Sequence, residues 1–148
     1  MEISRASIAD LDRLVPLFDA YRQFYAQPSD PDGARAFLSE RLERDESVIF
    51  LALGDDGRAL GFTQLYPSFT STRMQRIFVL NDLYVAPEGR CKGIARQLLA
   101  AATDFARAQG AARLGLSTAV TNHTAQTLYE ANGWTRDTQF YAYNLALD

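Results

Sequence analysis

The sequence contains a single cysteine, Cys91, and a single histidine, His123, among its 148 residues. One cysteine cannot form an internal disulfide, which suits a reducing compartment such as the cytoplasm. One cysteine and one histidine also cannot build a zinc site alone. We therefore expect a cytoplasmic protein without a metal cofactor.

The sequence also lacks a long apolar run and an excess of basic residues. No run approaches the length that spans a bilayer, and the first residues do not follow the pattern of a signal peptide. The net charge is −3 and the pI is about 5.1, so no general basic field attracts nucleic acid. We expect neither a membrane nor a nucleic acid as a partner. A cationic amine is a more favourable ligand for a protein of this net charge.

The amino-acid composition is typical of an ordinary globular protein. Hydrophobic residues make up 47% of the chain and charged residues 22%, which is not typical of disorder. A length of 148 residues fits one domain with a substantial core. We expect a single domain over residues 1–148, without internal repeats.

Hydrophobic periodicity and turn residues predict a mixed α/β (α+β) fold. The expected order begins with a strand at 1–6, a helix from 7 to about 26, a helix after the loop 27–33, and strands at 48–53, 58–66 and 75–85. A helix that ends at Gly110, a strand at 112–119, a helix from Asn122 to Asn132 and an aromatic-rich strand at 139–147 follow. Pro16 is expected to kink or segment the first helix. Pro67 is expected to end the strand 58–66. The strand 112–119 is expected to run parallel to 75–85.

The strongest functional signal is the turn at residues 88–93, which connects a strand to an amphipathic helix. Free N–H groups and the helix dipole attract anions at a helix start, and glycine lets a phosphate approach the backbone. Arg90, Lys92 and Arg96 add positive charge there. The turn lacks the spacing of a P-loop and of a dinucleotide fold. It predicts a phosphate site, and a tight surface turn without a ligand is the alternative.

Two motifs carry a resemblance to a known family. Residues 90–95 read R-x-x-G-x-A, which resembles the acetyl-CoA pyrophosphate loop of the GNAT superfamily of N-acetyltransferases. Asn122, Ala125, Tyr129, Glu130, Gly133 and Trp134 resemble the family's next helix. The two motifs cover roughly residues 80 to 134. The resemblance implies a GNAT-like sheet of about six to seven strands with about four helices, in which the fourth and fifth strands splay around the pantetheine arm. It also implies a homodimer.

The resemblance implies a set of cofactor contacts. They are Leu83, Tyr84, Val85, Arg90, Cys91, Lys92, Gly93, Ile94, Ala95, Arg96, Asn122, Ala125 and Tyr129. The backbone N–H groups of residues 83–85 would stabilise negative charge on the thioester carbonyl. Cys91 stands where the family commonly has glycine, and binding through its backbone is expected if its φ is negative. A redox role for this thiol is the alternative to a tolerated small residue.

The leaving thiolate needs a proton, and Tyr129 is the predicted donor. Tyr129 shares a helix face with Asn122 and Ala125, and a phenol with a pKa near 10 is protonated at neutral pH. A core aromatic at helical spacing is the alternative for Tyr129. A plain helix N-cap is the alternative for Asn122.

The attacking amine must lose a proton, because only about one primary amine in a thousand is neutral at pH 7. Asp82 is the predicted catalytic group, either as a base through water or as a holder of the cation, and an exposed strand carboxylate is an equal alternative. The candidate substrate wall consists of Tyr21, Phe24, Tyr25 and Tyr66, with Tyr141 and Tyr143 as further candidates. Packing without function is the alternative for each. His123 is expected to be exposed to solvent.

We therefore expect an acetyl-CoA-dependent N-acetyltransferase that acts by direct attack of an amine in a ternary complex. No residue pattern demands a covalent enzyme intermediate. The acceptor could be a small amine, a polyamine, an amino acid, or a protein lysine or N-terminus. Residues 80–85 and 122–126 resemble the branch that acetylates polyamines, histone tails and small amines. The alternatives are a non-catalytic acyl-CoA-binding sensor and an interaction domain.

Overall fold

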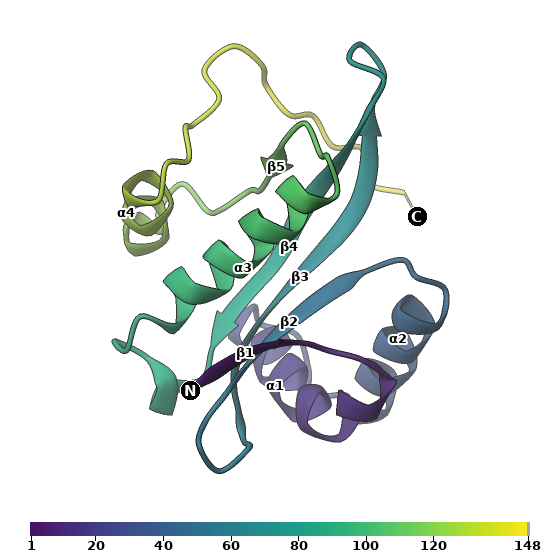
Figure 1. Ribbon diagram of the computed structural model, residues 1–148, viewed down its shortest axis with the longest axis vertical. Helices are drawn as coiled ribbons and strands as arrows, with labels where there is room; N and C mark the ends of the chain where they lie inside the picture. The colour runs from purple at the N-terminus through teal and green to yellow at the C-terminus, as the bar shows by residue number, and fades with distance from the viewer. Residues whose placement is uncertain (148) are drawn as a thin grey trace. The chain divides into compact units, whose positions relative to one another are not determined.

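A five-stranded mixed sheet organises the first part of the protein, drawn in Figure 1 from a computed structural model that describes residues 1–147. The chain forms two units, residues 1–117 and the residues from 118 onward. The strands lie in the order β1 (Glu2–Arg5), β2 (Val48–Leu53), β3 (Ala59–Thr70), β4 (Gln75–Val85) and β5 (Leu114–Gly115). The helices are α1 (Leu11–Phe24), α2 (Pro31–Glu43), α3 (Ile94–Ala108) and, in the second unit, α4 (His123–Ala131).

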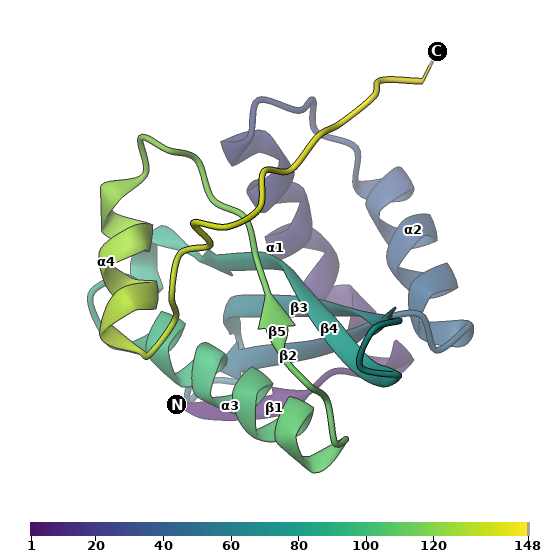
Figure 2. The same ribbon diagram turned by 90° about the horizontal axis from the view of Figure 1, so that it is seen from above.

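Helices cover both faces of the sheet in the first unit. Figure 2 shows α1 and α2 on one face and α3 on the other. On the first face, Leu14, Phe18 and Leu38 pack against Phe62 in one buried cluster. On the opposite face, Ile94 and Leu98 pack against Ala52. Neighbouring residues of a strand point to opposite faces, so β2 and β3 contribute to both clusters.

The amphipathic stripe predicted for the helix α3 is confirmed. Leu98, Leu99, Ala102 and Ala106 are buried, whereas Arg96 and Asp104 are exposed. The helix ends as predicted at Gly110, whose φ is +71° and whose N–H donates to the carbonyl of Arg107 at 3.0 Å. Glycine suits this left-handed position because it has no Cβ.

Two proline predictions need correction. Pro16 does not segment α1, which continues to Phe24, and Pro16 lies on the exposed side of the helix; the predicted kink stays a prediction. Pro67 does not end β3, which continues to Thr70 and pairs Pro67 with Phe78. The pairing of β3 with β2 stops at Leu65, so the missing N–H of Pro67 interrupts no ladder on that side.

The number of strands is lower than predicted. Residues 139–147 form no strand, and their large apolar side chains are 77–91% exposed at Phe140, Tyr141, Tyr143, Leu145 and Leu147. The predicted strand at 112–119 shortens to the two residues of β5. An alternating apolar pattern cannot form a strand by itself, because the backbone also needs a neighbouring strand with which to pair.

The predicted divergence of the fourth and fifth strands is confirmed. Strand β5 runs parallel to β4 and pairs with it only at Phe78 with Leu114 and at Val79 with Gly115. From Leu80 to Val85, β4 pairs with β3 alone. A register shift opposite Gln64 and Leu65 leaves Asn81 as an extra residue in β4, and such bulges re-aim side chains.

Helix α4 begins and ends where the sequence predicts. The Asn122 side chain accepts the N–H of Ala125 at 3.1 Å, and Gly133 follows the helix with a φ of +90°. Among the helices of residues 1–147, none has the length and apolar character needed to cross a membrane.

Candidate active site

The turn before α3 exposes a run of backbone donors. Gly93 is the N-cap of α3 with a φ of +74°, and no side chain caps the helix. The first N–H of the helix with a backbone acceptor is that of Gln97, which donates to Gly93 at 3.1 Å. The N–H groups of residues 91–96 find no acceptor in the described part of the chain. A Cβ placed on Gly93 would meet nothing within 4 Å, so the space beside Gly93 is open. Unpaired N–H groups at the start of a helix can bind an anion.

Cys91 departs from the backbone conformation expected for binding. Its φ is +62°, in the left-handed region, so the negative φ under which binding through its backbone is expected does not occur. A residue with a Cβ is disfavoured in that region, which explains why glycine is the usual choice. The Cys91 thiol is exposed.

The cations of the turn take two different positions. Lys92 and Arg96 are exposed near the start of α3. Arg90 turns back toward the sheet, where its Nε donates to the carbonyl of Val85 at 3.0 Å. Its guanidinium lies 5.8 Å from the ring centre of Tyr84 and 6.0 Å from that of Phe24. Arg90 therefore connects the turn to β4 and to the end of α1.

The open edge of β4 presents alternate backbone groups. The N–H of Ala86 donates to the carbonyl of Leu60 at 2.8 Å, and Val85 and Leu83 lie opposite Gly61 and Thr63. Residue pairs of an antiparallel ladder alternate between exchanging two hydrogen bonds and exchanging none. The N–H groups of Leu83 and Val85 therefore point away from β3, toward the side that β5 leaves open. This alternation turns the N–H of Tyr84 toward β3 and reduces the predicted donors at residues 83–85 to Leu83 and Val85.

Asp82 is buried, which excludes the alternative of an exposed strand carboxylate. The residue is 4% exposed. One carboxylate oxygen accepts the hydroxyl of Tyr21 at 2.7 Å and the side-chain N–H of Asn81 at 3.0 Å. The other oxygen accepts Nε2 of Gln64 at 2.5 Å. No ion pair within residues 1–147 includes Asp82, so neutral donors alone hold this carboxylate.

Two tyrosines beside Asp82 are neutral at physiological pH. Burial, and next the charge of Asp82, raise the pKa of Tyr21. Burial, and next the same charge, raise the pKa of Tyr66 to about 12, although Arg41 acts in the opposite direction. Both phenols can donate hydrogen bonds, and neither can serve as a base near pH 7.

Three residues of the predicted substrate wall, Tyr21, Phe24 and Tyr25, lie together at the end of α1, and their role as a wall stays a prediction. The Tyr21 ring lies 5.2 Å from that of Tyr25, and the Phe24 ring lies 6.2 Å from that of Tyr84. Phe24 and Tyr25 are 62% and 55% exposed. Tyr66 lies beyond this group in an open hollow that is also lined by Arg41, Asp45, Glu46 and Pro67. Tyr141 and Tyr143 belong to the second unit and are exposed.

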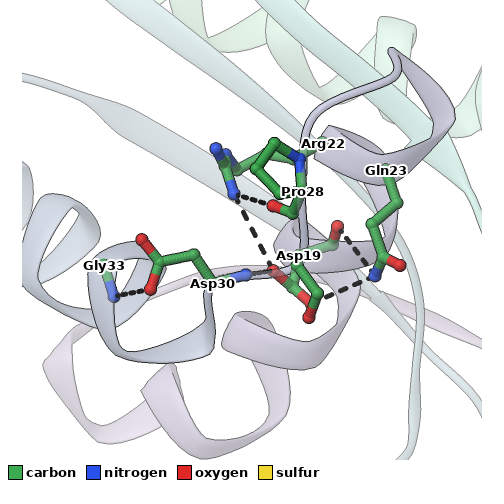
Figure 3. A network of polar contacts seen from close by, with 7 residues as sticks. Asp19, Arg22, Gln23, Pro28, Asp30 and Gly33 are labelled. Atoms are coloured by element: carbon green, nitrogen blue, oxygen red, sulfur yellow. Dashed lines mark hydrogen bonds and ion pairs between the residues drawn. The ribbon is translucent and has the colours of Figure 1, made fainter.

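A polar network fixes the loop between α1 and α2 beside this wall (Figure 3). The buried Asp19 carboxylate accepts the hydroxyl of Ser29 at 2.7 Å and the backbone N–H of Asp30 at 2.8 Å. Asp30 in turn caps α2 by accepting the N–H of Gly33 at 2.9 Å. The hydrogen bond from Asp30, and next that from Ser29, lower the pKa of Asp19. The end of α1 is thereby tied to the start of α2.

In the second unit, the predicted residues lie on α4. Asn122 caps the helix as described, and Tyr129 is half-buried with its ring 6.0 Å from that of Trp134. His123 is exposed, as predicted. The cofactor contacts of Asn122, Ala125 and Tyr129 stay predictions.

Sequence reasoning missed Gln64 and Asn81, two of the donors to Asp82. Gln64 carried a usable signal, because it is a long polar side chain in the middle of a predicted strand. Within residues 1–147, no group of three or more His, Cys, Asp or Glu side chains could hold a metal ion.

Comparisons with known proteins find similar acetyltransferases. The Acetyltransferase (GNAT) family matches residues 14–134. The uncharacterized N-acetyltransferase YhfO of Bacillus subtilis (strain 168) is 50% identical over 145 residues, which cover 98% of this chain and 97% of that protein. The crystal structure of a probable acetyltransferase has a TM-score of 0.96 at 47% identity and covers 100% of this chain and 99% of its own.

A more distant neighbour shares the fold. The aminoglycoside N-acetyltransferase AAC(6')-Iy, solved in complex with CoA, has a TM-score of 0.81 at 22% identity, and the match covers 99% of this chain and 95% of that one. The narrower likeness to enzymes of polyamines, histone tails and small amines stays a prediction. The family resemblance is confirmed, and the chain belongs to the GNAT family of acetyltransferases.

Proposed function

We propose that this protein transfers the acetyl group of acetyl-CoA to a primary amine by direct attack in a ternary complex. One observation carries the proposal. Strand β4 holds a buried carboxylate without a cationic partner at Asp82, and the N–H of the next residue, Leu83, lies on the open edge of the strand. A site for an ammonium group and a site for a thioester carbonyl are thereby adjacent on one strand.

The cofactor side of the site consists mainly of backbone. Acetyl-CoA would supply an activated thioester. The N–H groups of residues 91–96 and the side chains of Lys92 and Arg96 would hold its pyrophosphate. The N–H groups of Leu83 and Val85 would donate to the thioester carbonyl, where negative charge develops during attack.

The amine side of the site consists of the Asp82 carboxylate and the aromatic side chains beside it. Asp82 attracts the ammonium form and accepts one proton from it, directly or through water, so that the nitrogen lone pair can attack the carbonyl carbon. The nitrogen releases a second proton as the C–N bond forms and the C–S bond breaks. Tyr129 donates a proton to the departing thiolate, and the second proton of the amine replaces it through solvent, while the proton on Asp82 passes to solvent. The products are an N-acetyl amine, CoA thiol and one proton released to solvent.

A thiol-release assay tests this proposal. Purified protein is incubated with acetyl-CoA and a panel containing spermidine, single amino acids, lysine peptides and butylamine. We expect release of CoA thiol that depends on one or more of the amines. Binding of acetyl-CoA without release on any amine would instead favour a non-catalytic acyl-CoA sensor.

A further inference from the structure

Arg90 has the charge of a phosphate ligand, but its polar contacts lie within the protein. Its backbone N–H donates to the carbonyl of Pro87 at 3.3 Å, and its Nε donates to the carbonyl of Val85 at 3.0 Å. The run of backbone donors without an acceptor in the described part of the chain begins one residue later, at residues 91–96. Arg90 therefore lies just before the anion site of the turn.

The guanidinium of Arg90 lies beside the aromatic group that contacts Asp82. It is 5.8 Å from the ring centre of Tyr84 and 6.0 Å from that of Phe24, and both distances are within the range of a cation–π contact. The Tyr84 ring lies 5.9 Å from that of Tyr21, whose hydroxyl donates to Asp82 at 2.7 Å. A continuous series of contacts therefore leads from Arg90 to the carboxylate that we assign to the amine.

We propose that Arg90 is a positioning residue of the amine site, where it holds the exposed ring of Phe24 in place, and that it does not bind the phosphates of CoA. This inference rests on the proposed acetyl transfer and assigns a role to a further residue of the same site. It divides the three cations of the turn between two tasks. Lys92 and Arg96 remain for the pyrophosphate, and Arg90 serves the amine.

Phe24 depends on few contacts for its position. It is the last residue of α1 and is 62% exposed. Its ring lies 5.3 Å from that of Tyr25 and 6.2 Å from that of Tyr84, and Arg90 is its third neighbour. A side chain that is ordered only when the ligand arrives lowers the affinity for that ligand. A guanidinium anchored on the carbonyl of Val85 orders this ring beforehand.

The test compares the affinities for CoA and for butylamine in the full chain. Calorimetric titration gives the Kd of CoA, and thermal unfolding with saturating CoA gives an apparent Kd of butylamine. Arg90→Met should bind butylamine about fivefold more weakly, which is the loss expected for one exposed cation–π contact, and should bind CoA as tightly as the wild type. Lys92→Met and Arg96→Met should show the opposite pattern. Arg107→Met, which removes an exposed charge at the other end of α3, should keep both constants.

A double-mutant cycle tests whether Arg90 acts through Phe24. Phe24→Leu keeps an apolar side chain and removes the ring. In that background Arg90→Met should weaken the binding of butylamine by less than about twofold, because the effects of contacting residues are not additive. The same fivefold loss in both backgrounds would contradict an action through Phe24. Arg90→Lys keeps a cation that can lie over the ring, and it should bind butylamine more tightly than Arg90→Met.

Three further results would overturn the inference. The first is a loss of CoA affinity in Arg90→Met equal to that in Lys92→Met, which would return Arg90 to the phosphates. The second is an affinity of Arg90→Met for butylamine that equals or exceeds that of the wild type. The third is a wild type that does not bind butylamine.

Thiol release is measured in the same samples, so that the inference and the proposed reaction can fail separately. Binding of butylamine without any thiol release would reject the acetyl transfer and leave the role of Arg90 in place. Thiol release by the wild type, with an unchanged affinity for butylamine in Arg90→Met, would reject that role alone.

Discussion

At the scale of single residues, the proposed reaction depends on Asp82, which is buried and is held by neutral donors. Asp82 could be selected because it precedes Leu83 in a strand of a recognisable motif. Its burial and its donors could not be predicted, since Tyr21 and Gln64 lie 61 and 18 residues away along the chain. The same holds for Cys91, whose positive φ depends on how the turn joins β4 to α3.

We predict that Asp82→Asn lowers kcat/KM by about 100-fold or more, because the uncharged amide neither attracts an ammonium group nor accepts its proton. The affinity for acetyl-CoA should stay unchanged. Steady-state kinetics and calorimetric titration measure the two quantities. Asp55→Asn, at a carboxylate that is 97% exposed on a hairpin turn, is the control and should retain wild-type kinetics. Equal activity of Asp82→Asn and wild type would remove Asp82 from the reaction.

We predict that Gly93→Val weakens the binding of CoA. The substitution places a branched side chain in the open space before α3, and it forces a left-handed φ on a residue with a Cβ, at a cost of roughly 1–2 kcal/mol. Gly110→Val is a matched control, because Gly110 has a similar φ of +71° and open surroundings at the other end of the same helix.

Thermal unfolding with and without CoA separates the two effects of that substitution. At 100 times the Kd, CoA should add about 2.7 kcal/mol of stability to the wild type and to Gly110→Val. At the same concentration, Gly93→Val should gain much less. An equal gain in both variants would remove the turn from the cofactor site.

At the scale of helices and strands, the sequence succeeds where the signal is local. The amphipathic stripe and glycine cap of α3 and the N-cap Asn122 of α4 are local features, and the structure confirms them. Strand limits depend on the partner strand. Pro67 continues β3 because β2 has already ended beside it. Residues 139–147 carry a strand-like pattern but have no pairing partner among the described residues.

The junction of α1 and α2 leads to a prediction about pH. The pKa of Asp19 is lowered in the folded protein by the N–H of Asp30 and the hydroxyl of Ser29. A carboxylate with a lowered folded pKa contributes stability above its ordinary pKa near 4, and this contribution is lost as the pH falls toward the folded value. Wild type should therefore exceed Asp19→Asn in free energy of unfolding by about 1–2 kcal/mol at pH 7.

Urea unfolding at pH 7 and at successively lower pH measures this difference. It should shrink as the pH falls below about 4. Asp12→Asn is the control, because Asp12 lies on the same helix with a side chain that is 95% exposed, and it should change the free energy by less than about 1 kcal/mol. A difference for Asp19→Asn that is independent of pH would contradict an ionised role for this side chain.

At the scale of the whole molecule, the two units differ in what they contribute. The buried residues of the described chain all belong to the first unit, which holds the sheet, the turn before α3 and Asp82. The second unit carries α4 with Tyr129 and the exposed apolar residues after Gln139. The family could be predicted from its two motifs, and the order of the elements as far as α4 could be predicted from periodicity and turn residues. The homodimer stays a prediction.

We predict that Tyr129→Phe lowers kcat more than it lowers the affinity for acetyl-CoA, because the variant keeps the ring and loses only the proton donor. General acid catalysis contributes about 10²–10⁴-fold, so a decrease in kcat of at least tenfold is expected. Trp134→Phe, which changes the ring beside Tyr129 without removing the phenol, is the control. An unchanged kcat in Tyr129→Phe would exclude it as the acid.

The most direct measurement identifies the product of the reaction. The protein is incubated with acetyl-CoA and butylamine, and mass spectrometry of the amine is combined with quantification of free thiol. We predict N-acetylbutylamine and CoA thiol in equal amounts, both lost in Asp82→Asn. Thiol release without an acetylated amine, or no reaction with butylamine or any other primary amine of the panel, would contradict acetyl transfer to primary amines.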